Sequence, residues 1–242
     1  MKALLTMHAW HVFGRGTVRF IVAMSLVVVL SLIRLTRRHL PAVERVLFNT
    51  DYVLDYALES MMLIKVCALS LMTYVAMKLF VMTPYDIALV QRTPRLKVFL
   101  SKLIVLMMSG VVAVSLWWLW AQSIGAMAHG TVHPTFGPEA LCALSLMMGV
   151  YGALFSLGGV GFKHLLALLL VWVLFWVTEM AVDFGLPISS LSLSVRVLNA
   201  LVANAHVFNA DEVGTVWPWR VSVFIGFMYA FFAAVIYRRQ AF

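Results

Sequence analysis

Charged residues are scarce in this chain, and their scarcity excludes a soluble protein. Asp, Glu, Lys and Arg together make up 12% of the 242 residues, whereas 63% are hydrophobic and the mean hydropathy is +0.97. A soluble domain of this size could not carry that composition without aggregating. We therefore expect an all-α fold whose helices cross a membrane several times.

Acidic residues are the scarcer of the two charged kinds. There are 10 Asp and Glu against 18 Lys and Arg, which gives a formal net charge of +8. In a membrane protein, basic residues mainly set the orientation and contact anionic lipid headgroups. The expected partner of this charge is the lipid bilayer, and no nucleic acid is expected.

Motifs for metal, disulfide or nucleotide chemistry are also lacking. Cys67 and Cys142 each lie in an apolar segment, where a thiol behaves as a small hydrophobic group. The histidines form no HExxH pair, and His129 and His133, which share one loop, are better explained as solvated side chains than as metal ligands. The turn SLGGVGFKH has no Ser or Thr after Lys163, so it is not a Walker loop. We expect no metal, cofactor or nucleotide site in this chain.

Long apolar segments dominate the sequence. A helix needs roughly 20 apolar residues to cross a hydrocarbon core of about 30 Å. In the fourth apolar segment, Gly149, Gly152 and Ser156 are spaced for close contact between helices. The semi-apolar connection 185–219 predicts a pair of short helices that enter the outer leaflet. The whole pattern predicts one transmembrane domain over residues 1–242, with an interfacial helix at 1–17 and six spans at about 18–33, 52–81, 103–121, 139–157, 164–184 and 220–237.

The distribution of basic residues predicts the orientation. Most of the 18 fall on one side of the predicted membrane, at both termini, in the interval 84–102 and at Lys163. Because basic residues favour the cytoplasmic side, we expect both termini to face the cytoplasm across a bacterial inner membrane. The first external loop violates this rule locally, since it carries Arg34, Arg37, Arg38 and Arg45.

Four charged residues are predicted at membrane depth. Lys65 lies near the middle of the second span and Glu59 toward its outer end, while Glu179 and Asp183 lie toward the outer end of the fifth. An uncompensated charge at this depth costs roughly 2.5 to 3.5 kcal/mol. We hypothesise that Lys65 pairs with Glu179 across the bundle, inside it or along a transport path. The alternative is that Lys65 extends to the interface and the acids lie there.

One basic interval, PYDIALVQRTPRLKVFLSK at 84–102, separates the second and third spans. It carries the positive charges of Arg92, Arg95, Lys97 and Lys102. Its apolar residues can form a stripe along one helix face, made of Ile87, Val90, Leu96, Phe99 and Leu100. The interval therefore predicts a cytoplasmic helix that binds an acidic, partly apolar partner. The alternative is that it fixes the loop on the inside and contacts anionic lipid.

This plan resembles the membrane subunit of ATP-binding-cassette exporters of the type 2 permease family. The local similarity lies in LVQRTPRLKVFLSKLIV, with an apolar pair, a Thr-Pro-Arg step and a later Ser-Lys that leads into the third span. The family has Gly where Ser101 stands, and a small residue where Arg95 follows Pro94 directly. Asp86 is similar to an acidic residue that the family carries upstream.

The resemblance implies that the interval is a coupling helix, docked into a groove on a separate ATPase subunit. The docking residues would be Asp86, Arg92, Pro94, Arg95, Lys97, Phe99 and Lys102. It also implies that ATP and Mg²⁺ bind the partner ATPase, that this chain is not itself an enzyme, and that it pairs with a second permease copy or a related chain. The expected cargo is an amphipathic peptide, a drug or a lipid.

Two other classes of protein remain open. A membrane-embedded enzyme or assembly factor of lipid or envelope metabolism would use Glu59, Glu179, Asp183 or the loop histidines, which form no recognisable catalytic set. A secondary transporter would show inverted repeats, and none is apparent. A neighbouring gene for an ATPase would separate these classes from the exporter.

Overall fold

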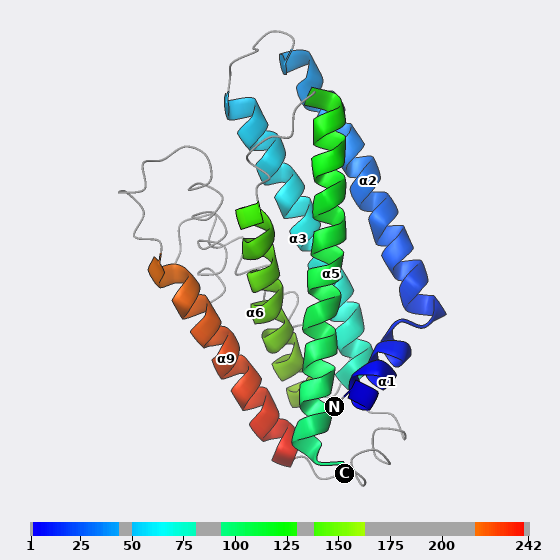
Figure 1. Ribbon diagram of the computed structural model, residues 1–242, viewed down its shortest axis with the longest axis vertical. Helices are drawn as coiled ribbons and strands as arrows, with labels where there is room; N and C mark the ends of the chain where they lie inside the picture. Colours follow the sequence, from blue (N-terminus) through cyan, green and yellow to red (C-terminus); the bar gives the residue numbers. More distant parts are fainter. Residues whose placement is uncertain (1, 44–49, 81–92, 130–137, 163–215, 240–242) are drawn as a thin grey trace.

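The computed structural model describes residues 2–43, 50–80, 93–129, 138–162 and 216–239, and all their regular secondary structure is helical (Figure 1). The predicted all-α fold is thereby confirmed for this part of the chain. The helices are α1 (Lys2–Val12), α2 (Arg15–Val43), α3 (Thr50–Phe80), α5 (Arg95–His129), α6 (Pro138–Phe162) and α9 (Val216–Arg239).

The long helices lie side by side in an up-and-down bundle around α5. Figure 1 shows α2 and α5 running in one direction and α3, α6 and α9 returning, so the start of α1, the start of α5 and the end of α9 lie at the same end. Helix α5 contacts each of the five other described helices, and α6 packs most extensively against α9.

Four of the described helices contain segments long and apolar enough to cross a membrane. These segments are Arg15–Arg37, Leu63–Phe80, Arg95–Met127 and Leu144–Gly161. They support a multi-pass membrane protein. Helix α9 covers the predicted sixth span at 220–237, whereas the predicted fifth span and the connection 185–219 lie outside the described residues. The number of six spans stays a prediction.

The end of α2 and the start of α5 differ from the boundaries expected for the first and third spans. Helix α2 does not end at the arginine cluster but continues through Arg34 and Arg37 to Val43. Helix α5 begins at Arg95 rather than near residue 103, because Pro94 can open a helix without losing a needed N–H. The Pro94 carbonyl oxygen accepts hydrogen bonds from the N–H groups of Lys97 and Val98, at 2.9 and 3.3 Å. With 35 residues, α5 is about 52 Å long and exceeds the hydrocarbon core.

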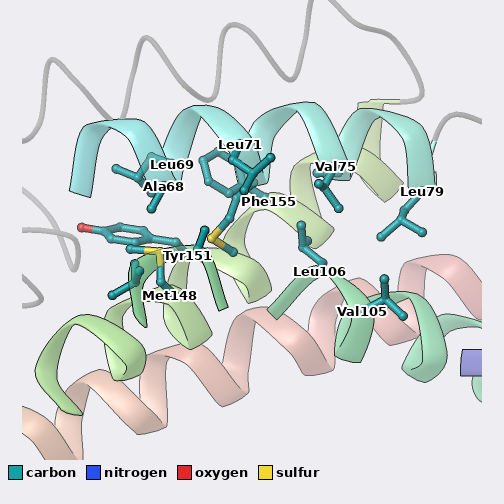
Figure 2. Packing of buried hydrophobic residues seen from close by; sticks show 14 of the residues in the cluster. Ala68, Leu69, Leu71, Val75, Leu79, Val105, Leu106, Met148, Tyr151 and Phe155 are labelled. Carbon is teal, nitrogen blue, oxygen red and sulfur yellow. The ribbon is translucent and has the colours of Figure 1, made fainter. Parts of the chain in front are cut away.

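The apolar core lies where α3, α5 and α6 meet. Figure 2 shows Leu71 and Val75 of α3, Leu106 of α5 and Phe155 of α6 gathered between the helices. Glycine permits this close approach, because a Cβ at Gly152 would lie 2.8 Å from Cγ of Met107. The close contact predicted for Gly152 is thus confirmed, whereas a Cβ at Gly149 would meet no atom within 4 Å.

A buried polar contact also joins α2 to α5. The indole Nε1–H of Trp117 donates a hydrogen bond of 3.0 Å to Ser25 Oγ, and both side chains are buried. A polar pair between membrane helices that satisfies each partner fixes how the two helices are rotated against each other.

Candidate functional site

Charge is distributed unequally between the two ends of the described bundle. The end that holds the start of α1, which we call the basic end, carries Lys2, Arg15, Arg19, Lys78, Arg95, Lys97, Lys102, Arg238 and Arg239. Every acidic residue of the described helices lies toward the opposite end, in the first half of α3 or at the start of α6; these are Asp51, Asp55, Glu59 and Glu139. The basic end is therefore the strongest candidate for a surface that binds anionic partners.

At one corner of the basic end, the start of α5 is tied to the last turn of α9. Arg95 Nη1 donates a hydrogen bond of 3.0 Å to the carbonyl oxygen of Arg238. Basic side chains stabilise the C-terminal end of a helix, where carbonyl groups lack intrahelical partners. One turn further into α5, the ring of Phe99 lies 5.5 Å from that of Tyr237 and 6.2 Å from that of Phe80. We call these three rings the aromatic cluster.

Lys102 belongs to the same corner. Its Nζ lies 6.0 Å from the centre of the Phe80 ring, at the outer limit of a cation–π contact. The side chain is 2% exposed and that of Phe99 is 1% exposed, so both lie inside the bundle. Neither residue contributes to the outer surface of the described chain, although both were expected among the docking residues.

The described part of the predicted docking interval is the first two turns of α5, not a separate helix. Its exposed residues are Leu96, Lys97 and Leu100, together with Pro94, and Arg95 is half-buried beside α9. We call Leu96, Lys97 and Leu100 the α5 surface patch. Asp86 and Arg92 lie outside the described residues. The structure thus brings only part of the predicted docking set together on one surface.

The partner of Arg95 could not have been found from the sequence, because Arg238 is 143 positions away. The burial of Lys102 did carry a signal. Lys102 lies three residues after Phe99 and four before Leu106, which is the spacing of one helix face. That face continues through Ala113 and Trp117, which are also buried.

The charged residues predicted at membrane depth are only partly described. Lys65 lies in the middle of α3 and is 3% exposed, so its ammonium group is inside the bundle. Glu59 lies six residues earlier on the same helix. Glu179 and Asp183 lie outside the described residues, so the proposed pair of Lys65 with Glu179 stays a hypothesis.

A second corner of the basic end is the bend between α1 and α2, which we call the elbow. Lys78 Nζ of α3 donates a hydrogen bond of 2.9 Å to Oγ1 of buried Thr17, and it lies 5.0 Å from the centre of the Tyr74 ring. The Tyr74 ring stacks on that of Phe20 with centroids 4.8 Å apart and an angle of 9° between the planes. These contacts fix the first turns of α2 against the last turns of α3.

An apolar groove of about 270 Å³ opens on the side of the bundle between α5, α6 and α9. It is bounded by small and aliphatic residues and one aromatic residue; these are Met107, Leu146, Gly149, Val150, Val223, Gly226, Phe227 and Ala230. A Cβ at Gly226 would lie 3.3 Å from Cγ2 of Val150, so α6 and α9 are close at the floor of the groove. At Gly149 the groove is open.

Comparison with protein-family models, curated proteins and solved structures gives no match for this chain. The likeness to type 2 permeases therefore remains a hypothesis, and its support must come from the chain itself.

Proposed function

We propose that this chain is the permease subunit of an ATP-driven exporter, which forms a transport path with a second permease and couples to a separate ATPase. The observation that carries the proposal is the α5 surface patch at the basic end. There an exposed lysine stands between two exposed leucines, at an end where the described helices carry no acidic residue. Such a surface suits a partner groove with apolar walls and carboxylates at its rim.

The mechanical link of the patch to the bundle also suits coupling. Residues 95–102 are the first two turns of α5, and this helix contacts all the other described helices. A force applied to the patch would therefore be transmitted as a rigid-body movement of α5, and through the Arg95–Arg238 hydrogen bond to α9. In this proposal, ATP and Mg²⁺ bind the ATPase, and its closure moves the start of α5.

The α5–α6–α9 groove favours an apolar or amphipathic cargo, such as a peptide, drug or lipid. Its boundary is apolar and it opens sideways, where hydrophobic molecules partition from the membrane. The membrane-embedded enzyme and the secondary transporter remain alternatives, but no contact among the described residues favours either of them.

Co-purification tests this proposal. The tagged full-length chain is extracted from its native membranes and the proteins bound to it are identified. We expect an ATP-binding-cassette ATPase among them. In the double variant Leu96→Ser with Lys97→Glu, an apolar contact is lost and a charge is reversed at the patch. We expect the retained ATPase to fall at least about fivefold, which corresponds to the roughly 1 kcal/mol of one interfacial contact.

The matched control is Ile33→Ser with Arg34→Glu in α2. It also replaces an exposed aliphatic residue by serine and reverses the charge of its exposed neighbour, near the opposite end of the bundle. This control variant should retain the ATPase as the unchanged chain does. If no such ATPase co-purifies, or if the patch variant binds and stimulates it normally, the proposed function is wrong.

A further inference from the structure

The outer face of α2 changes from basic to apolar beyond the elbow. Arg15 and Arg19 are one turn apart and both are exposed. Val22, Leu26, Leu30 and Ile33 follow at helical spacing on the same face and are exposed as well. From Val22 to Ile33 the face extends about 16 Å, roughly half of a 30 Å hydrocarbon core. This length matches the thickness of the acyl-chain layer of one leaflet.

The two arginines have no partner in the described part of the chain. Neither guanidinium makes a hydrogen bond or an ion pair with a described residue, and no acidic residue of the described helices lies at this end. The opposite face of the same turns is occupied, since Thr17 and Phe20 are held against α3 by Lys78 and Tyr74. The elbow therefore holds Arg15 and Arg19 on its outer side.

Exposed aromatic side chains precede these charges in the sequence. Trp10 at the end of α1 is 79% exposed, and Phe13 in the bend is exposed too. Aromatic rings beside basic residues are typical of the headgroup level of a bilayer, where one end of a side chain is apolar and the other is wet. Side chains of a helix also lean toward its N-terminus, so Arg15 and Arg19 lean toward the basic end and away from the apolar face.

We propose that the elbow binds one anionic phospholipid of the leaflet at the basic end. Arg15 and Arg19 bind its phosphate, Trp10 and Phe13 lie at the level of the headgroup, and its acyl chains follow Val22 and Leu26. A free anion or an acidic protein would satisfy the arginines but not the apolar face below them, whereas a phospholipid satisfies both. This site lies apart from the α5 surface patch and does not depend on the proposed transport function.

Native mass spectrometry of the purified full-length chain tests the site. The chain is exchanged into nanodiscs that contain phosphatidylcholine with a small fraction of phosphatidylglycerol, and retained lipids are counted after release. We expect one strongly retained phosphatidylglycerol. Each basic residue near an anionic headgroup contributes about fivefold to affinity, so Arg15→Gln with Arg19→Gln should weaken retention about thirtyfold. Arg15→Lys with Arg19→Lys should keep most of it, since the charge remains.

The control is Arg34→Gln with Arg37→Gln, which removes two exposed arginines from the same helix near its other end. It should leave the retained lipid unchanged. Inorganic phosphate at 10 mM, chosen as roughly a physiological level, should not displace the lipid, because it lacks acyl chains. The proposal is overturned if both glutamine pairs lower retention equally, if the elbow pair lowers it not at all, or if inorganic phosphate displaces the lipid. The thermal unfolding midpoint of each variant shows whether the protein is still folded.

Discussion

Two glycines of α6 lie in opposite surroundings. A Cβ at Gly159 would lie 2.8 Å from Cβ and 3.1 Å from Cγ of Phe80, whose ring belongs to the aromatic cluster. The ring cannot move away without disturbing Phe99. At Gly149 the same added atom meets nothing within 4 Å.

The variant Gly159→Ala should therefore destabilise the bundle by about 1 to 3 kcal/mol, the usual cost of overpacking a filled site. Gly149→Ala should be neutral or stabilising by up to about 1 kcal/mol, because alanine favours the helix and fills open space. Titration of the detergent-solubilised protein with sodium dodecyl sulfate measures both. Equal midpoints for the two variants would show that α6 does not pack on Phe80 in this way.

Among the elements, α5 shows best what the sequence could and could not predict. Its apolar length predicts a membrane helix from about residue 103, whereas the charges and the apolar stripe of 84–102 predict a separate helix that includes Arg95, Lys97 and Lys102. In the structure the helix begins at Arg95 and buries Lys102 beside Phe80. Helical spacing from Phe99 would have predicted this burial, whereas the contact with Arg238 depends on tertiary packing.

The continuous α5 helix predicts how its first turns respond to labelling. Single cysteines replace Leu96, Phe99, Leu100 and Lys102 in a Cys142→Ser background, since Cys142 is exposed and Cys67 is buried. In detergent, the cysteines at the two leucine positions should react with a maleimide at least about tenfold faster than those at 99 and 102, because buried thiols react slowly. Equal reactivity at all four positions would contradict the continuous, packed helix.

At the level of the whole molecule, charge asymmetry was the most useful information in the sequence. It predicted that the segments near both termini share one end, and Figure 1 places the start of α1 and the end of α9 together. The arginine cluster after the first span remains an exception to the positive-inside rule. In the structure, Arg34 and Arg37 lie on α2 and not in a loop. The proposed ATPase requires that the basic end faces the cytoplasm, whereas the proposed lipid site requires only that this end lies at a membrane surface.

Sidedness of the two ends is therefore the most direct test. In the Cys142→Ser background, Lys97→Cys marks the basic end and Met127→Cys marks the other, where Met127 is 86% exposed at the end of the α5 segment. Intact cells are treated with a membrane-impermeant maleimide before and after permeabilisation. We expect Met127→Cys to be labelled in intact cells and Lys97→Cys only after permeabilisation, as the positive-inside rule requires. Labelling of Lys97→Cys from outside would place the patch beyond the reach of any ATPase and would contradict the account.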